Sequence, residues 1–450
     1  MSTRLGSPLA RTLLAGALAN SGAAAVLVLR NLLDGYYAAQ LSAEAMAALT
    51  LTVPVSLLLI GLSQGISVVT ANRIAVGSKN PRHDDAALIS HASLAALLYG
   101  TVSAVLLWML FPLLISAYGT DLRLVPRATA VGGGILASAP LLFLFGTLTA
   151  TLRGLGSAAG AARATVVGLG LGAAASALFM LGAVPWFSQE PLLGIPAGLA
   201  LGYGAAISIA ACELRELRRQ NVCRGQFALQ QGACVTAGIA RAAMPIVANN
   251  LVGLAAMFVV FGMAARAGVE TTAAFGTVYR IEQFGMIALN GIVLAIAPLA
   301  ARHWNERDKL RELVATGLAL QLALCVVLGG ALALGAGPIS RVFDLPAPAS
   351  ALVVTWLGYL SVSLFFQGVT LTCTVLLQIR RPANALLLTG LRLYGCLLPL
   401  LWLITPHAPA AVYPLMCCVQ VVSGGAWLAF LWRTRQAGSG ARAPADVTAT

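Results

Sequence analysis

The chain has 450 residues, of which 59% are hydrophobic and only 10% are charged, and its mean hydropathy is +0.87. A soluble domain carries roughly 25% charged residues, so this composition excludes an ordinary soluble protein and indicates a membrane protein. The formal net charge of +13 would suit a nucleic-acid partner, but membrane topology explains the placement of the basic residues without one.

Windows of apolar residues recur along the chain, with the length of about 20 residues that crosses a hydrocarbon core of about 30 Å. Water is absent from that core, so backbone groups must pair within each segment and the segments are predicted to be helices. The sequence predicts spans near 12–33, 48–72, 88–115, 128–152, 160–184, 192–212, 238–264, 271–300, 313–336, 350–378, 384–404 and 410–432.

Lysine and arginine are distributed unevenly between the two sides of the predicted membrane. With the N-terminus in the cytoplasm, the cytoplasmic segments hold 20 of the 28 basic residues, the outer loops hold 4 and the spans hold 4. Cytoplasmic loops of membrane proteins carry such an excess. We therefore expect a multi-pass protein of the bacterial inner (plasma) membrane, with both termini in the cytoplasm.

Asp34 is the most informative residue of the first span, because it follows the apolar run 12–33. An ionised carboxylate in hydrocarbon costs several kcal/mol, so an acid at membrane depth usually has a functional reason. We predict that Asp34 binds a coupling ion, either a proton or a cation. In one alternative Asp34 lies just past the helix end in water, and in another it forms a structural ion pair with Arg30, one helical turn earlier.

The second half of the chain repeats the first. Residues 43–48 (Ala-Glu-Ala-Met-Ala-Ala) match residues 269–274 (Val-Glu-Thr-Thr-Ala-Ala), and six predicted spans fall in each half. An even number of spans keeps both repeats in the same orientation, as in transporters with parallel repeats. The predicted fold is an all-α membrane protein, with twelve transmembrane helices in two pseudo-symmetric six-helix bundles. Its parts are an N-terminal lobe (1–212), a cytoplasmic linker (213–237), a C-terminal lobe (238–433) and a disordered cytoplasmic tail (434–450).

Substrates of such transporters bind near the membrane midplane, at the interface between the repeats. The polar or aromatic side chains predicted to line a substrate cavity are Asn20, Tyr37, Gln64, Asn249, Asn250, Glu282, Asn290 and Gln367. Taken singly, each of the amides more often makes an interhelical hydrogen bond than a ligand contact, although together they could line a cavity. The alternative for Glu282 is a helix clamp with Arg392 or Arg241. Phe143 and Phe145 offer aromatic faces to a cation, or simply pack.

Other patterns point away from catalysis. The His-x4-Asp spacing of His303 and Asp308 occurs in some membrane acyltransferases, but here it stands alone in a basic loop. Glycine at every second position of 168–172 predicts close helix packing. No glycine-rich loop precedes a lysine, and the cysteines lack a metal-binding spacing. We predict no enzyme, no metal site and no cofactor beyond a coupling proton or sodium ion.

Several motifs resemble the multidrug and toxic compound extrusion (MATE) family of the MOP flippase superfamily. They are Asp34-Gly35 with residues 41–48, Leu152-Arg153-Gly154-Leu155-Gly156 after the fourth span, and residues 273–276 with Arg280-Ile281-Glu282 in the eighth. The resemblance covers nearly the whole chain. It implies two six-helix lobes that export small amphipathic, often cationic, organic compounds in exchange for protons or sodium, and it implies Asp34 as the ion-coupling residue.

The chain departs from that family where other ion-binding side chains are expected. Gly172 and Ser176 occupy the positions on the fifth helix where the family often has Asn and Asp. The acids of the seventh and tenth helices fall near Gly253 and near Phe366, beside Gln367. Because a hard cation needs several oxygen ligands, these departures favour proton coupling through Asp34, or a member of the family with weak or altered coupling.

We expect a small-molecule substrate, surrounding membrane lipid, no nucleic acid and a monomer. The alternative function is a flippase for lipid-linked precursors, which would need a wide cationic cavity. The arginines available within the spans for such a cavity are Arg30, Arg241, Arg280 and Arg392. A membrane-embedded enzyme ranks third, because it needs catalytic residues beyond His303.

Overall fold

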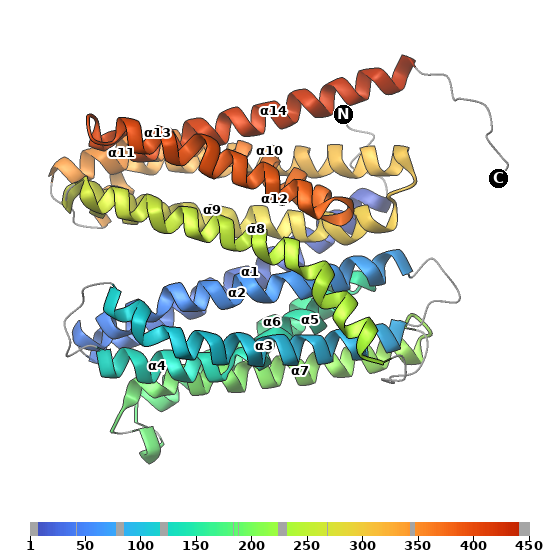
Figure 1. Cartoon of the computed structure of the whole chain (residues 1–450), viewed down its shortest axis with the longest axis horizontal. Helices are drawn as coiled ribbons and strands as arrows, with labels where there is room; N and C mark the ends of the chain where they lie inside the picture. Colours follow the sequence, from blue (N-terminus) through green and yellow to red (C-terminus); the bar gives the residue numbers. More distant parts are fainter. Residues whose placement is uncertain are drawn as a thin grey trace. The chain divides into compact units, whose positions relative to one another are not determined.

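The computed structural model of the chain describes residues 8–41, 43–77, 85–117, 125–182, 184–187, 189–223, 232–267, 269–342 and 347–440, and within these ranges every regular element is a helix (Figure 1). The elements are α1 (Pro8–Leu41), α2 (Ala43–Gly77), α3 (Asp85–Ala117), α4 (Val125–Ala137), α5 (Ala139–Gly154), α6 (Ala158–Met180), η1 (Pro185–Phe187), η2 (Pro191–Leu193), α7 (Gly194–Arg219), α8 (Gly232–Arg266), α9 (Val269–Arg302), α10 (Arg307–Val342), α11 (Ala347–Arg380), α12 (Pro382–Gly390), η3 (Leu391–Leu397), α13 (Leu398–Ile404), η4 (Pro409–Ala411) and α14 (Val412–Gly440).

The number of candidate membrane spans matches the sequence prediction. Among the described residues, 11 spans are long and apolar enough to cross a membrane, and the count is 12 when the bent pair α4 and α5 forms one span. Each span pairs its backbone groups internally, as hydrocarbon requires. The chain is therefore an all-α, multi-pass membrane protein.

Several helices run beyond their predicted spans. The ninth span, predicted over 313–336, is the middle of α10, which extends from Arg307 to Val342. Hydropathy locates the apolar middle of a helix, whereas a helix continues into its polar ends. For the same reason α7 ends at Arg219 and α8 begins at Gly232, both within the predicted linker. Helix α14 reaches Gly440, past the predicted start of the tail, and residues 441–450 lie outside the described residues.

Two spans contain an irregularity that hydropathy did not predict. Helices α4 and α5 meet at Ser138 with a bend of 41°, and Pro140 follows at the start of α5. Proline lacks the N–H that would continue the helical ladder, and the Ser138 hydroxyl donates to the Ile135 carbonyl at 2.7 Å. In the eleventh span, residues Leu391–Leu397 form a π-helical turn just before Pro399.

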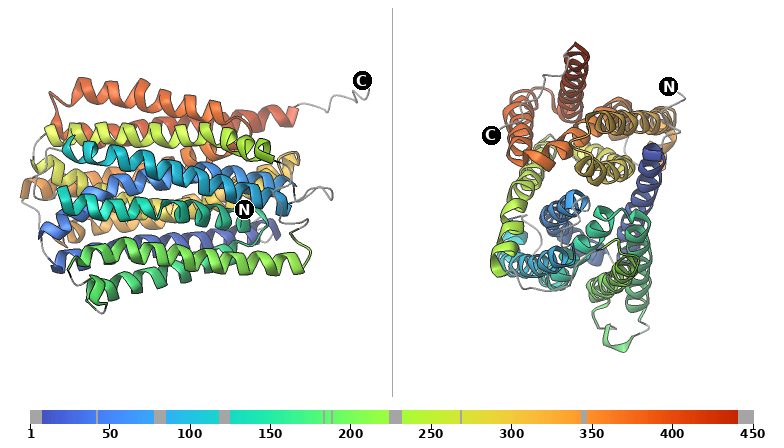
Figure 2. Two further views of the ribbon diagram at one scale, coloured as in Figure 1. Left: turned by 60° about the horizontal axis from the view of Figure 1, so that its bottom comes forward. Right: turned by 90° about the vertical axis from the view of Figure 1, so that its right-hand side faces the viewer.

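The chain divides into two compact units. Unit 1 comprises Met1–Ala255, Asn290–Gly317 and Leu377–Thr389, and unit 2 comprises Ala256–Leu289, Leu318–Leu376 and Gly390–Thr450. Within unit 1 the helices α1 to α7 run side by side, as the end-on view in Figure 2 shows.

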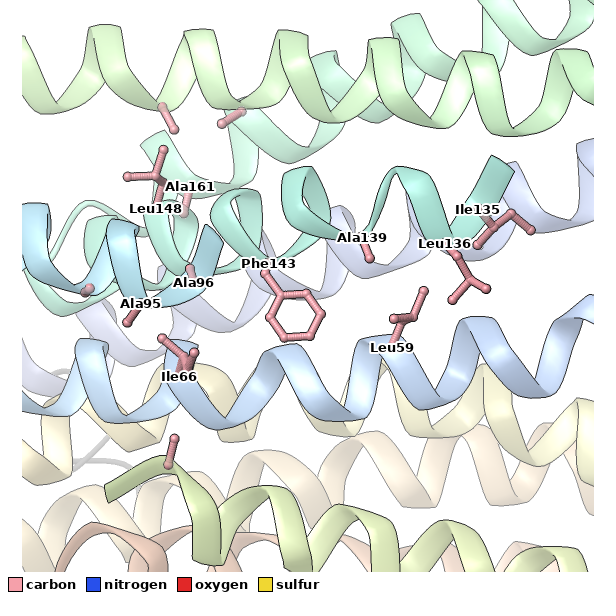
Figure 3. Packing of buried hydrophobic residues seen from close by; sticks show 14 of the residues in the cluster. Leu59, Ile66, Ala95, Ala96, Ile135, Leu136, Ala139, Phe143, Leu148 and Ala161 are labelled. Carbon is pink, nitrogen blue, oxygen red and sulfur yellow. The ribbon is translucent and has the colours of Figure 1, made fainter. Parts of the chain in front are cut away.

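Aromatic side chains form part of the unit 1 core. Phe143 of α5 is fully buried in a cluster that includes Leu59 and Ile66 of α2, and its ring points toward that helix (Figure 3). Phe145 stacks on Tyr203 of α7, with 5.6 Å between ring centroids. Both side chains therefore pack the core, which was the simpler of their two predicted roles.

Helices α6 and α7 approach closely through glycine, as predicted from residues 168–172. A Cβ on Gly172 would lie 2.7 Å from the Gly198 carbonyl oxygen and 2.8 Å from the Gly202 Cα, and one on Gly168 would clash with Ala206. A Cβ on Gly170 would meet no atom within 4 Å. Two of the three glycines are thus needed for packing, which places Ser176 of α6 in the buried interior.

We expect Gly172→Leu to destabilise the protein by about 1–3 kcal/mol, because overpacking forces helices apart. The melting temperature in detergent measures this effect. The matched control is Gly170→Leu on the same helix, which should melt within about 1 °C of the parent chain, since surface changes away from packed features have small effects. Equal melting temperatures for the two variants would contradict the assignment.

Candidate ion-coupling and substrate sites

Asp34 lies inside a helix and away from water. Helix α1 continues past Gly35 to Leu41, and the Asp34 side chain is buried, with a relative exposure of 6%. The alternative in which Asp34 is wet and lies past the helix end is therefore wrong. Tertiary packing outweighs the cost of Gly35, which is about 1 kcal/mol relative to alanine in a helix interior.

Arg30 is the partner of Asp34. The Arg30 Nε lies 3.5 Å from Asp34 Oδ2, at i,i+4 spacing on α1, and Arg30 is 1% exposed. Its Nη2 donates to the Ser176 hydroxyl of α6 at 3.4 Å, and that hydroxyl donates to the Ile195 carbonyl of α7 at 3.5 Å. These contacts connect the acid on α1 to two neighbouring helices.

The ion pair is loose. Arg30 Nε and Nη1 are buried without a hydrogen-bond partner among the described residues, so the guanidinium makes no bidentate contact with Asp34. Strong pairs of arginine with carboxylate have two parallel hydrogen bonds at shorter distances. The predicted contact with Arg30 is therefore present, and its geometry leaves both charged groups incompletely satisfied in a buried place.

The fifth span supplies few additional oxygen ligands near Asp34. Ser176 provides one hydroxyl. Gly172 has no side chain to offer, and it packs against α7. Tyr37, one turn beyond Asp34, is half-buried and packs on the unit 1 core. The described side chains thus offer a carboxylate beside a guanidinium, which suits a proton better than a hard metal cation.

Two of the predicted polar residues meet in unit 1. Asn250 of α8 donates to the Gly61 carbonyl of α2 at 3.0 Å and lies 3.5 Å from Gln64 Oε1. Asn249 is buried and its Oδ1 has no hydrogen-bond partner within the described part of the chain, whereas Asn290 of α9 is half-buried. The contacts of Asn250 are those of an interhelical hydrogen bond, one of the two roles predicted for it.

Asn20 lies on a different part of α1. Its side chain is 2% exposed, and it lines a pocket together with residues of α5, α6 and α9 that include Arg153 and Arg302. Its amide oxygen and nitrogen are both buried without a hydrogen-bond partner in the described structure.

Glu282 and Gln367 come together in unit 2. Glu282 of α9 is 5% exposed and accepts a hydrogen bond from Gln367 of α11 on one oxygen. On the other oxygen it accepts one from the Tyr413 hydroxyl of α14 at 2.9 Å. The predicted clamp with Arg392 is wrong, because Arg392 contacts Gln420 at 3.5 Å. Arg241 is exposed in unit 1, and its contact with Glu282 stays a prediction.

Tyr413 is the functional candidate that the sequence prediction missed. It is fully buried, stacks on Trp356 with 5.5 Å between centroids, and meets the edge of Phe275 at 6.0 Å. A buried tyrosine hydroxyl usually requires a hydrogen-bond partner. A tyrosine within the twelfth apolar run therefore indicated a buried hydroxyl that needs a hydrogen-bond partner, but it did not identify Glu282 as that partner.

The patterns that suggested other chemistry do not assemble into sites. His303 Nδ1 lies 3.1 Å from Glu306 Oε1, so its contact is with the next turn rather than with Asp308. Among the described residues, no group of three His, Cys, Asp or Glu side chains gathers as a metal site would.

Comparison with known proteins identifies the family. The MatE family model matches residues 21–178 and 245–402, one segment in each half of the chain. A FAD transporter of Shewanella oneidensis is 25% identical over 407 residues, which cover 88% of each chain.

Solved structures share the fold at low sequence identity. A MOP superfamily transporter of Pyrococcus furiosus, described as having a binding pocket of reverse polarity, superposes with a TM-score of 0.86 at 19% identity, covering 98% of both chains. A MATE transporter of Vibrio cholerae has a TM-score of 0.85 at 17% identity, covering 97% of this chain and 99% of its own. The family match spans both repeats and most of the sequence, and the protein therefore belongs to the MatE family of membrane transporters and is not an enzyme.

Proposed function

We propose that this transporter is a secondary active antiporter that exports a small amphipathic organic compound in exchange for protons. It would act in the bacterial inner membrane, with both termini in the cytoplasm, by alternating access between its two lobes. The observation that carries the proposal is the buried carboxyl group of Asp34, whose contact among the described residues is the single loose ion pair with Arg30.

The pair suggests how proton binding drives a conformational change. When Asp34 takes a proton, Arg30 becomes a buried cation without a countercharge. Leaving one member of a buried pair uncompensated costs about 3–5 kcal/mol. Arg30 also contacts Ser176 of α6, so relieving that cost requires α1 to move against α6. Release of the proton restores the pair and the original packing.

Proton coupling is favoured over sodium by the count of oxygen ligands. Ser176 Oγ already interacts with Arg30 and with the Ile195 carbonyl. The guanidinium beside Asp34 would also repel a second cation. A proton needs one carboxyl oxygen, whereas a hard cation needs several oxygen ligands.

A cationic substrate is supported by the chemistry around Glu282. Its carboxyl group faces the neutral donors Gln367 and Tyr413, and the rings of Tyr413, Trp356 and Phe275 lie in one cluster. An acidic group beside aromatic faces is a suitable surface for an organic cation. Glu282 and Gln367 are therefore proposed substrate contacts. In the proposed transport cycle, they become accessible to substrate when unit 2 opens.

A second candidate substrate is an organic anion. The relative that is 25% identical over most of the chain is a FAD transporter, and the buried guanidinium of Arg30 would suit a negatively charged substrate once Asp34 is protonated. Family membership is compatible with both substrates, so a transport assay has to choose between them.

Replacing Asp34 with asparagine tests the coupling residue. Asp34→Asn keeps the shape of the side chain and removes the titratable group, so we expect efflux driven by a pH gradient to fall to the background of empty proteoliposomes while membrane expression persists. Glu216→Gln, a change of the same kind at an exposed site on α7, should transport normally. Undiminished efflux by Asp34→Asn would remove Asp34 from the mechanism.

The ion pair itself is tested by stability. Arg30→Gln leaves the Asp34 carboxylate buried without a countercharge, and we expect a loss of about 3–5 kcal/mol. The double variant Arg30→Gln/Asp34→Asn carries no buried charge and should regain most of that loss while remaining uncoupled. The melting temperature in detergent distinguishes the variants. A double variant no more stable than Arg30→Gln would show that the pair contributes little.

Proteoliposome transport of an organic cation dye and of FAD, under the same imposed pH gradient, identifies the substrate class. For a cation exporter we expect transport of the dye, and Glu282→Gln should reduce its rate at least about tenfold, the effect of losing roughly 1.4 kcal/mol of binding. Transport of FAD with no movement of the dye would favour the anion, and scrambling of labelled lipid would favour a flippase.

A further inference from the structure

A pocket in unit 1 is lined mainly by apolar atoms, and among them lie two arginines and one asparagine that can bind an anion. It lies where α1, the end of α5, the start of α6 and the end of α9 meet, and the residues that matter for its chemistry are Asn20, Arg153, Gly156, Ala158 and Arg302. Among the described residues, none of those that line it is Asp or Glu.

Two guanidinium groups line the pocket without a countercharge. Neither Arg153 nor Arg302 forms an ion pair among the described residues, and the Arg302 Nη2 donates to the Gly154 carbonyl at 3.2 Å. The carboxylate of Glu213, which approaches Gly160 on α6, is already paired with Arg163 at 2.9 Å. The two cations therefore lack a carboxylate partner in the described part of the pocket.

Asn20 supplies an independent sign that a ligand belongs there. Its side chain is 98% buried and lines the pocket, yet both of its amide atoms lack a hydrogen-bond partner in the described structure. Buried polar side chains are almost always hydrogen-bonded, so an unpaired amide needs an explanation such as a missing ligand. The amide nitrogen can donate to an anionic oxygen.

The start of α6 adds backbone donors. Helix α6 (Ala158–Met180) begins in the pocket, and its N-cap residue Ser157 makes no side-chain capping bond. The first N–H groups of a helix point outward without partners, and the helix dipole favours negative charge at that end. Helix N-termini commonly bind phosphate for this reason.

We propose that this pocket binds a phosphate group, held by Arg153, Arg302, Asn20 and the N-terminal turn of α6. Phosphate fits better than a single carboxylate because donors converge from several elements and arginine binds phosphate oxygens with two parallel hydrogen bonds. The basic residues of this end lie in the segments assigned to the cytoplasm by their positive charge. The phosphate belongs either to a soluble compound in the cytoplasm or to a phospholipid headgroup.

The bound group would join the two repeats. Arg153 lies in the last turn of α5 in the first repeat, whereas Arg302 ends α9 in the second, and both lie in unit 1. A phosphate held by both would favour the conformation in which these helix ends are close. This role does not depend on Asp34 or on the direction of transport.

Thermal unfolding of the full chain in a maltoside detergent, which contains no phosphate, tests the proposal. The soluble probe is inorganic pyrophosphate, with sodium chloride at equal ionic strength as the control for salt, and the lipid probe is phosphatidylglycerol added to the same micelles. A raised melting temperature with pyrophosphate identifies a soluble source, and one with phosphatidylglycerol alone identifies a lipid headgroup. No rise with either probe, or an equal rise with sodium chloride, would overturn the proposal.

Substitutions of the two lining arginines show whether the probe binds in this pocket. Arg153→Gln and Arg302→Gln should each weaken the stabilising response at least tenfold in probe concentration. The matched control is Arg215→Gln, at an exposed arginine on α7 that does not line the pocket, and it should leave the response unchanged. A response that survives in both Arg153→Gln and Arg302→Gln would overturn the site.

Asn20→Leu separates ligand binding from a structural role and covers the case in which an arginine variant fails to fold. If the Asn20 amide binds the ligand, the leucine variant without probe should melt at or above the melting temperature of the parent chain. Its melting temperature should also rise less when the probe is added. A variant that melts lower without probe and responds fully would show that Asn20 is structural and would overturn its part in the site.

Discussion

Hydrocarbon offers no hydrogen-bond partner, and this one constraint organises the protein. Backbone groups are paired within helices, so the polar side chains inside the bundle have to find partners on neighbouring helices. Asn250 does so with the Gly61 carbonyl, and Glu282 with Gln367 and Tyr413. This pairing is incomplete at Arg30 and Asn20, and these are the places where we propose that a proton or a ligand acts.

The spans could be predicted from sequence because hydropathy reports the composition of each segment. The helix ends and the bend at Ser138 could not, for physical reasons. A helix such as α10 continues into charged residues after the hydrocarbon ends, and the composition of 128–152 is equally apolar whether the helix is straight or bent. Pro140 was visible in the sequence, but many transmembrane helices accommodate proline without a break of 41°.

The two buried acids show how far a site can be predicted. Arg30 and Asp34 share one helix, so their i,i+4 spacing was enough to predict their contact. Glu282 and Tyr413 lie 131 residues apart on different helices, and their contact depends on how each helix is rotated about its axis. Sequence spacing carries no information on that rotation. The sequence analysis therefore proposed arginine partners for Glu282, whereas its partners in the structure are the neutral donors Gln367 and Tyr413.

The difference between these two acids has a consequence for coupling. In unit 1 the carboxyl group faces a buried cation, so a proton on Asp34 would leave an uncompensated positive charge and disfavour the existing packing. In unit 2 the carboxyl group faces a hydroxyl and an amide, so a proton on Glu282 would remove an isolated negative charge and favour burial. Protonation of Asp34 would thus loosen unit 1, whereas protonation of Glu282, a separate event, would consolidate unit 2. The two acids would in this way give the two halves of the chain opposite responses to proton binding.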